Sequence, residues 1–456
     1  MSLSLNEASP FRPNGALIFC RVIDNFGDAG VTWRLAGRFT SLGMRATLVI
    51  DDMATLRKLV PTLVELPRKD IRDPRVWTSM DVRVIEWADF ERALEADAPL
   101  LAPSRMPELV FETFGCRLPE KLERQLAEHS ADPRRLILNL EYLSAEDWVE
   151  DSHNVWGLHP SLNLKKLWFF PGFTDRTGGV IIEDALRETM DAKLEKSLRV
   201  QCLKAIGLQG DAITFYVFTY PENDLKGLAE GFKALAATRK VNVMLAPGKA
   251  GEKLLAELGG KTEGLAVKMM PFVTQGEFDK MIKLADVVWV RGEDSFVRAQ
   301  LNALPLVWSI YPTEDLAHHV KLRAWLARLA PYFARPEEYE RWRAFLESWV
   351  MGTMTPESFV AWVDELPVWA EAMRRWQHTL FARGDLVDRI ISRWQQIQEE
   401  AGAAPAACTR PHVDEDGATY GDTPVHKPVR NVDAAGLGGR GVVRSLRGLR
   451  LKTKAA

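Results

Sequence analysis

The stretch that decides the fold reads Val-Val-Trp-Val-Arg-Gly-Glu-Asp-Ser-Phe-Val-Arg-Ala-Gln and occupies residues 287–300. It opens with an apolar, β-branched run that predicts a buried strand. A charged turn from Arg291 to Asp294 follows, and Phe296 and Leu301 then continue at helical spacing. The stretch therefore predicts a strand, a loop and the start of a helix, as found throughout α/β proteins.

This junction carries groups that suit a diphosphate. The first backbone N–H groups of a helix lack partners within the helix, so they can donate to a phosphate oxygen. Arg291 can add charge-assisted hydrogen bonds to a diphosphate, and Glu293 can accept one from a sugar hydroxyl. Asp294 or Ser295 can equally serve as a plain helix cap, which requires no ligand.

Length and composition describe a multidomain protein. The chain has 456 residues, which predicts two or three domains, and 46% of them are hydrophobic. The balance of 59 basic against 62 acidic residues argues against general nucleic-acid binding. Cys20, Cys116, Cys202 and Cys408 match no zinc spacing and are typical of reduced thiols. With neither a signal peptide nor a membrane-spanning run, we expect a cytoplasmic protein without membrane or direct nucleic-acid partners.

The first half of the chain has the pattern of a doubly wound sheet. An apolar strand at residues 15–22 leads into the loop Ile-Asp-Asn-Phe-Gly-Asp-Ala-Gly at 23–30, a helix, and a second strand at 46–50. Further strands are predicted at 82–85, 108–111 and 136–140. Gly27 and Gly30 allow a ligand to approach the backbone, but they do not form a GxGxxG dinucleotide fingerprint.

The second half repeats the pattern, with strands predicted at 213–219, 242–246, 266–270 and 287–290. Because the carboxyl ends of parallel strands meet at one edge, we expect the residues that follow them to share a site. Those residues are Phe218, Tyr220, Phe272, Gln275, Arg291 and Glu293. A base could stack on the aromatic rings, with the diphosphate beside Ser295.

The C-terminal part contains two kinds of sequence. Residues 336–398 are largely helical, and their tryptophans lie on apolar stripes that predict core packing. From about residue 400 the chain is rich in Ala, Gly and Pro and ends in a basic segment. Such a segment cannot bury enough apolar surface to fold, so we expect disorder. The basic end could touch RNA or an acidic partner, or have no role.

Two doubly wound Rossmann-like domains facing a central cleft describe a GT-B architecture. We expect a first domain at 1–182, a second at 183–365, helices at 366–400 that cross back to the first, and a disordered tail at 401–456. This architecture serves nucleotide-sugar transferases, epimerases and phosphorylases, so it leaves the chemistry open.

Three segments carry a resemblance to a known family. They are Phe-Cys-Arg-Val-Ile-Asp-Asn-Phe-Gly-Asp at 19–28, Pro-Phe-Val-Thr-Gln at 271–275, and Arg-Gly-Glu-Asp-Ser-Phe-Val-Arg-Ala-Gln at 291–300. They resemble segments of the protein-arginine rhamnosyltransferases that modify translation elongation factor P. The resemblance implies transfer of L-rhamnose from dTDP-β-L-rhamnose to an arginine of elongation factor P, with inversion at the anomeric carbon.

The resemblance also implies roles for individual residues. Its donor site falls on Phe218, Tyr220, Phe272, Gln275, Arg291, Glu293, Asp294 and Ser295. Its acceptor-side carboxylates fall on Asp24 and Asp28. Thr274 departs from the family pattern, in which proline is the more frequent residue at this position.

The chemistry accords with these residue types. Guanidinium is a poor nucleophile, because its lone pairs are delocalised and its pKa exceeds about 12. Two carboxylates can hold it and accept its proton as the C–N bond forms. We assign Asp28 as the general base and Asp24 as the orienting partner, while Glu293 holds the sugar and Arg291 stabilises the leaving diphosphate. No DxD-like pair stands beside that site, so we expect no metal or other cofactor.

Two other classes of function remain compatible with these residues. One is a GT-B nucleotide-sugar transferase or epimerase that acts on a small molecule or lipid. The other is a binding protein without catalysis that uses the crevice for recognition. Apart from either class, Asp24 and Asp28 could simply form a turn and cap a helix.

Overall fold

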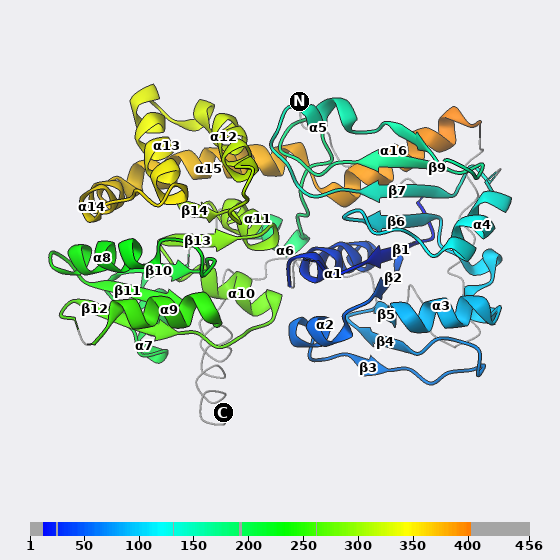
Figure 1. Ribbon diagram of the computed structural model, residues 1–456, viewed down its shortest axis with the longest axis horizontal. Helices are drawn as coiled ribbons and strands as arrows, with labels where there is room; N and C mark the ends of the chain where they lie inside the picture. The colour runs from blue at the N-terminus through cyan, green and yellow to red at the C-terminus, as the bar shows by residue number, and fades with distance from the viewer. Residues whose placement is uncertain (1–11, 24–25, 131, 191–193, 261, 403–456) are drawn as a thin grey trace, which may run out of the picture. The chain divides into compact units, whose positions relative to one another are not determined.

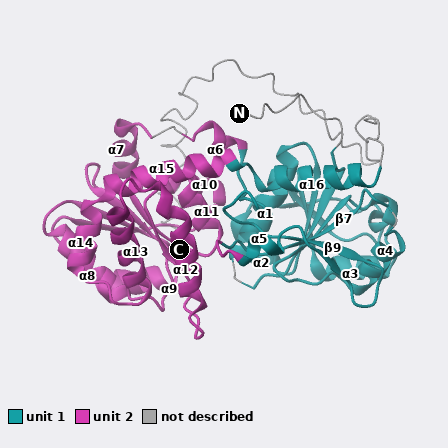
Figure 2. Ribbon diagram, turned by 90° about the horizontal axis from the view of Figure 1, so that it is seen from above, with its two compact units in different colours: residues 1–144, 148–183, 383–429 teal, residues 145–147, 184–382, 430–456 magenta. Residues whose placement is uncertain are grey.

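The computed structural model describes residues 12–23, 26–130, 132–190, 194–260 and 262–402, and these form two compact units (Figures 1 and 2). Among the described residues, unit 1 comprises 12–144, 148–183 and 383–402, and unit 2 comprises 145–147 and 184–382. Residues 403–456, most of the tail expected to be disordered, lie outside the described residues. Within the described ranges, no helix combines the length and apolarity needed to cross a membrane.

Unit 1 is built on a sheet of nine strands in the order β3-β4-β5-β2-β1-β6-β7-β9-β8. The strands are β1 (Gly15–Cys20), β2 (Arg45–Ile50), β3 (Val64–Glu65), β4 (Val76–Ser79), β5 (Val82–Glu86), β6 (Leu109–Thr113), β7 (Leu136–Leu140), β8 (Trp156–Leu158) and β9 (Lys165–Phe169). The six strands from β5 to β9 in this order are parallel, whereas β3, β4 and β8 pair antiparallel at the two edges. The doubly wound sheet expected for this half is confirmed.

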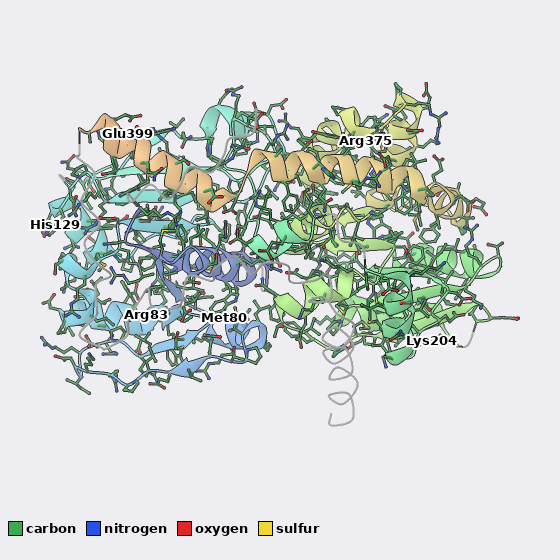
Figure 3. The ribbon with its side chains drawn as sticks, turned by 180° about the vertical axis from the view of Figure 1, so that it is seen from behind. Met80, Arg83, His129, Lys204, Arg375 and Glu399 are labelled. Atoms are coloured by element: carbon green, nitrogen blue, oxygen red, sulfur yellow. The ribbon has the colours of Figure 1, made fainter. Side chains whose placement is uncertain are left out.

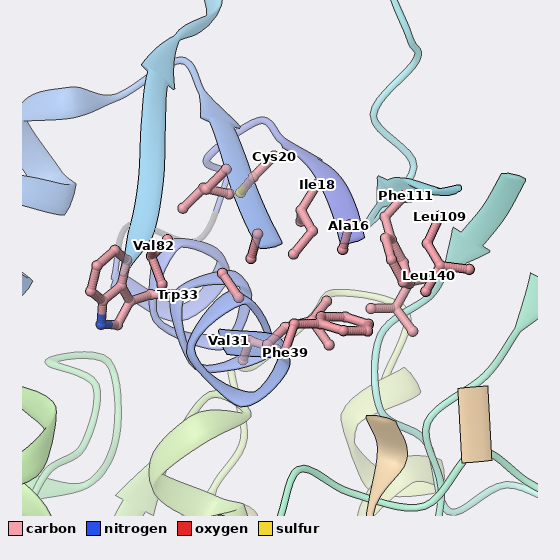
Figure 4. Close-up of a cluster of buried hydrophobic side chains, with 14 of the residues drawn as sticks. Ala16, Ile18, Cys20, Val31, Trp33, Phe39, Val82, Leu109, Phe111 and Leu140 are labelled. Carbon is pink, nitrogen blue, oxygen red and sulfur yellow. The ribbon is translucent and has the colours of Figure 1, made fainter. Parts of the chain in front are cut away.

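Helices cover both faces of this sheet. They are α1 (Phe26–Ser41), α2 (Met53–Leu59), α3 (Trp87–Glu95), α4 (Glu120–Glu128), α5 (Trp148–Ser152) and α16 (Leu386–Glu400), with short 3-10 turns at Pro99–Leu101 and Pro103–Arg105. Side chains of β1 alternate between two cores. Ile18 belongs to the core that holds Phe39 of α1 (Figure 4) and also Trp394 of α16. Phe19 belongs to the other core and packs against Phe90 of α3. A strand buried on both faces has to be apolar throughout, as β1 is.

Unit 2 contains a parallel sheet of five strands in the order β12-β11-β10-β13-β14. Its strands are β10 (Ile213–Val217), β11 (Val241–Leu245), β12 (Leu265–Met269), β13 (Val287–Arg291) and β14 (Leu306–Ser309). Its helices are α6 (Asp184–Glu188), α7 (Lys196–Ala205), α8 (Leu225–Ala236), α9 (Lys249–Leu258), α10 (Gln275–Ile282), α11 (Asp294–Leu301), α12 (Ala317–Leu329), α13 (Pro336–Val350), α14 (Pro356–Asp364) and α15 (Leu366–Arg383), with a 3-10 turn at Ala330–Tyr332. The strand, loop and helix predicted at 287–300 are β13, its turn and α11.

The tryptophans of the helical segment pack in cores, as their spacing predicted, and those from Trp342 to Trp376 lie in unit 2. The ring of Trp289 on β13 lies 6.0 Å from that of Trp349 and 6.2 Å from that of Trp362. Trp369 of α15 donates from its indole nitrogen to the Trp362 carbonyl oxygen at 2.8 Å. Trp376, about two turns further along α15, is also buried.

These contacts correct one expected boundary. We expected residues 366–400 as a whole to cross back, but α15 belongs to unit 2 as far as Ala382. Only the chain from Arg383 returns to unit 1, where α16 packs. An apolar helical stripe indicates that a helix is buried, but it does not tell which core buries it.

A buried ion pair fixes the returning chain in unit 1. Arg38 of α1 donates from Nε to Asp385 at 3.0 Å, and their side chains are only 3% and 0% exposed. The same carboxylate accepts the backbone N–H of Ile182 at 2.7 Å and that of Asp388 at 3.3 Å, so it also caps α16. Burial raises the pKa of Asp385 to about 6, although Arg38 and the Ile182 N–H act to lower it.

Replacing Asp385 with asparagine should lower the free energy of unfolding by about 3–5 kcal/mol at a pH of about 7.5, because Arg38 then stays buried without its carboxylate. The loss should grow as the pH falls below about 6, since the raised pKa lets the folded wild type take up a proton there before the unfolded chain does, which stabilises it, whereas asparagine cannot be protonated. Urea denaturation followed by circular dichroism on both sides of this pH measures both effects.

Asp388→Asn is the matched control. Its carboxylate lies 3.9 Å from Arg38 but is 45% exposed, so its loss should cost less than about 1 kcal/mol. An Asp385→Asn protein as stable as the wild type at the higher pH would contradict the role given to this pair.

Candidate active site

The carboxyl edge of the unit 2 sheet brings three of the predicted residues into contact. Arg291 is the last residue of β13, and its guanidinium carbon lies 4.5 Å from the ring centres of both Phe218 and Tyr220, which follow β10. The guanidinium also donates to the Thr219 carbonyl oxygen at 3.3 Å. Two aromatic faces and a carbonyl thus fix the position of this cation.

The strand register explains why Arg291 lies beside Phe218 and Tyr220. β10 and β13 are parallel neighbours, and the N–H of Phe218 donates to the Trp289 carbonyl oxygen at 3.0 Å beyond the paired residues. The loop after β10 is anchored by the Thr219 hydroxyl, which hydrogen-bonds to Ser309 at 2.9 Å. Tyr220 is further braced by the ring of Tyr311, edge-on at 5.2 Å.

The start of α11 is held by its own turn. Gly292 adopts a left-handed conformation with a φ of 63°, which lets the chain reverse between strand and helix. Ser295 donates from its hydroxyl to the Arg291 carbonyl oxygen at 2.6 Å, which closes that turn. Glu293 occupies the N-cap position but makes no side-chain capping bond. Ser295 therefore sits beside Arg291 at the positive end of a helix, as predicted.

Gln275 joins this group from α10. Its amide donates to the Asp294 carboxylate at 3.3 Å. The helix begins at Gln275 because Thr274 caps it, exchanging hydrogen bonds with Glu277 in a capping box. Thr274 thus provides the helix start here. Phe272, three residues before this helix begins, is 45% exposed.

Sequence reasoning missed Arg298. Its side chain is 1% exposed, and its Nε lies 3.8 Å from Asp294 and 3.9 Å from Asp279. The positive charge of this guanidinium offsets the negative charges of two carboxylates next to the proposed anion site. It therefore lowers the electrostatic repulsion that an incoming diphosphate would meet. The signal was available, because Asp294 and Arg298 stand four residues apart on one helix.

Asp28 belongs to unit 1 and follows the carboxyl end of β1. It is the third residue of α1 and only 2% exposed, and its Oδ2 accepts the backbone N–H of Ile23 at 2.8 Å. Thr32 donates to the Asp28 carbonyl oxygen at 2.8 Å. This carboxylate closes the loop before α1, and Asp24, its expected partner, lies outside the described residues.

Two further groups of residues bear on cofactors and reactivity. In the described ranges, no group of three or more His, Cys, Asp or Glu side chains is arranged to hold a metal ion. Cys20, Cys116 and Cys202 are free thiols and buried, while Cys408 lies outside those ranges. Burial raises the pKa of both Cys20 and Cys116 to about 12, so neither is a nucleophile near neutral pH.

Comparison with known proteins identifies the relatives of this chain. The family model described as elongation factor P (EF-P) rhamnosyltransferase EarP matches residues 17–395. The protein-arginine rhamnosyltransferase of Shewanella oneidensis is 35% identical over 331 residues, which are 68% of this chain and 79% of that protein. The enzyme of the same description from Pseudomonas putida is 32% identical over 391 residues, 82% of this chain and 97% of that protein.

A solved structure shares the fold. Its description reads "Structural basis for EarP-mediated arginine glycosylation of translation elongation factor EF-P". It aligns with this chain at a TM-score of 0.52 and 24% sequence identity. The alignment covers 83% of this chain and 98% of that one. The GT-B class expected from the two Rossmann-like domains is confirmed.

The Arg298 contacts generate a prediction about anion binding. Arg298→Met should weaken the affinity for pyrophosphate by about tenfold, or about 1.4 kcal/mol, because two carboxylates lose their countercharge beside the site. Adding Asp279→Asn to this variant should recover part of the affinity, since one of those negative charges is then absent. Isothermal titration calorimetry measures both. Asp279→Asn alone should bind pyrophosphate somewhat more tightly than the wild type, because it removes one negative charge near the site. An Arg298→Met protein with wild-type affinity would refute the role given to Arg298.

Proposed function

The chain belongs to the EF-P rhamnosyltransferase family, EarP, and on this premise we propose that it transfers L-rhamnose from dTDP-β-L-rhamnose to an arginine side chain of elongation factor P, in the cytoplasm. As a member of this family the chain is a glycosyltransferase. The observation that carries the proposed donor site is the Arg291 guanidinium, held against Phe218 and Tyr220 beside the start of α11.

Three features of unit 2 support a dTDP-sugar as the donor. The stacked guanidinium of Arg291 is already oriented, so little conformational freedom is lost when it binds a diphosphate. The helix start at Ser295 adds backbone N–H groups and the positive end of the helix dipole. The exposed ring of Phe272 offers a face on which a thymine base can stack.

The reaction is a single displacement with inversion. The acceptor nitrogen attacks the anomeric carbon from one side, and the bond to the diphosphate oxygen breaks on the other. Asp28 accepts the proton from the attacking guanidinium as the C–N bond forms, and Asp24 helps orient the planar fork. Glu293 binds the rhamnose hydroxyls. Arg291 and the α11 start neutralise the charge that develops on dTDP, so the reaction needs no metal or other cofactor.

Asp28→Asn should reduce the transfer rate by at least about a hundredfold, since the amide cannot accept the proton. The full-length protein is incubated with dTDP-rhamnose, elongation factor P and EDTA, and the intact mass of the acceptor is followed. The wild type should add one deoxyhexose, and EDTA should leave the rate unchanged.

The matched control is Asp51→Asn. Asp51 also accepts a backbone N–H from the loop after β1, that of Val22 at 2.9 Å, but it has no assigned role in catalysis. Its variant should keep a rate within about threefold of the wild type. No mass gain with wild type, or an undiminished rate with Asp28→Asn, would remove this mechanism. Rhamnose transfer to a small molecule or lipid instead would favour the alternative GT-B activity.

Arg291→Ala should weaken dTDP binding by at least about tenfold, because the charge-assisted hydrogen bonds to the diphosphate are lost. Thymidine has no diphosphate, so its weaker affinity should change little. Calorimetry with both ligands separates the two contributions. Arg323→Ala, which removes a surface arginine paired with Glu347 in the same unit, is the control. Equal dTDP affinity of the Arg291→Ala and wild-type proteins would contradict the assignment.

A further inference from the structure

Glu141 is a half-buried residue directly after the carboxyl end of β7. Its backbone N–H donates to the Phe169 carbonyl oxygen at 3.1 Å, which continues the pairing of β7 with β9. Its carboxylate accepts the backbone N–H of Tyr142. In the part of the chain that the structure describes, no basic group lies close enough to offset its charge. With only that N–H acting against it, burial raises the pKa of Glu141.

Other carboxylates of this sheet have a cation. Glu112 and Glu123 share Lys166, whose amine lies 2.8 Å from the first and 2.7 Å from the second. A carboxylate partly removed from water costs free energy unless a positive charge or several hydrogen bonds replace the lost solvation. A carboxylate that keeps this cost without a cation is therefore a candidate for binding one from a partner.

Glu141 shares the carboxyl edge of the unit 1 sheet with the proposed base. Glu112 of β6 pairs with Phe19 of β1 on one side and with Asn139 of β7 on the other, so the three strands end at one level. Figure 3 shows His129, which follows α4, at the opposite edge, where β7 begins. Neighbouring strands are about 4.8 Å apart, so the ends of β1 and β7 are about 10 Å apart.

An aromatic pair lies at the same edge. Phe114 follows β6, donates its N–H to the Leu140 carbonyl oxygen at 2.8 Å and has a left-handed φ of 56°. Its ring stacks on that of Tyr142, with centres 4.5 Å apart, and Tyr142 is still 39% exposed. A bulky residue rarely adopts a positive φ, and such strain persists chiefly at functional sites. A carboxylate and an aromatic ring in adjacent residues suit a long basic side chain, through its charged head and its apolar stem.

We propose that Glu141 is a second recognition point for the acceptor protein and binds the positive head of another lysine or arginine, near the arginine that is modified. An extended chain advances about 3.3 Å per residue, so a basic residue within about three positions of the modified arginine can reach Glu141 while that arginine meets Asp28. This inference rests on the proposed function, because it takes elongation factor P as the acceptor. Glu141 binds and orients the acceptor and takes no part in proton transfer.

Glu141→Gln in the full-length protein tests the proposal. Glutamine keeps the size of the side chain and an oxygen for the Tyr142 N–H, but it carries no charge. The KM for elongation factor P should rise by about tenfold while kcat stays within about twofold, since only acceptor binding is weakened. Calorimetry without donor should show a similar loss of affinity for elongation factor P, and added salt should weaken binding to the variant less than binding to the wild type.

Glu108→Gln is the matched control. Glu108 is also half-buried, but it stands just before β6, at the amino edge of the same sheet, and lies 3.9 Å from Arg134. Its variant should keep the wild-type KM and affinity. If Glu141→Gln binds elongation factor P as the wild type does, this inference is wrong and the proposed transfer reaction still stands. A wild type that does not bind elongation factor P at all would overturn both.

A double-mutant cycle identifies the basic partner. Each lysine or arginine of elongation factor P in the stated range around the modified arginine is replaced with glutamine in turn. One replacement should weaken binding to the wild-type enzyme by about tenfold and have little further effect on binding to Glu141→Gln. The proposal fails if the acceptor has no basic residue in that range, or if every replacement weakens binding to both enzymes equally.

Discussion

The position of α1 in unit 1 depends on the buried pair of Arg38 and Asp385. Neither side chain is solvated, so each is stable in the core only with the other present. Because Asp385 also accepts the Ile182 N–H, one carboxylate joins α1, the end of the first half of the chain, and the returning α16. Arg34 adds a second link from α1, to Glu183 at 3.1 Å. Asp28 stands at the other end of α1, so the placement of the proposed base follows from contacts two to three turns away.

In unit 2, helix α11 is likewise held in place by buried contacts at the end away from the proposed site. The helix is buried from Ser295 to Leu301, and its last turn is fixed by Gln300, whose side-chain oxygen accepts from Trp325 at 3.0 Å and from Trp376 at 2.8 Å. With its far end held by the aromatic core, the helix cannot shift along its axis. The turn at Arg291 and the first N–H groups therefore keep one position, which is what a preorganised anion site requires.

Sequence patterns predicted the parts of this protein that depend on local periodicity. The apolar run and helical spacing of 287–300 predicted β13 and α11, since both patterns follow directly from strand and helix geometry. Sequence patterns could not predict contacts between residues that are far apart in the chain. Arg38 and Asp385 are separated by 347 positions, and each alone has the pattern of an ordinary polar surface residue. The role of Asp28 was ambiguous for a chemical reason: a helix-closing aspartate and a general base are the same residue type.

The low exposure of Asp28 bears on that ambiguity. An arginine approaches with its charge intact, so a carboxylate in a water-poor setting attracts it more strongly than one in open solvent. In the proposed transfer, one proton passes from the attacking nitrogen to this carboxylate as the C–N bond forms, and the glycosylated guanidinium keeps its positive charge. The Ile23 N–H, bound to Oδ2, keeps the carboxylate in one orientation meanwhile. The burial and the hydrogen bond that suffice for a helix cap therefore also suit the proposed base. Guanidinium is too weak an acid to lose its proton beforehand, so the proton can leave only while the new C–N bond makes the nitrogen more acidic.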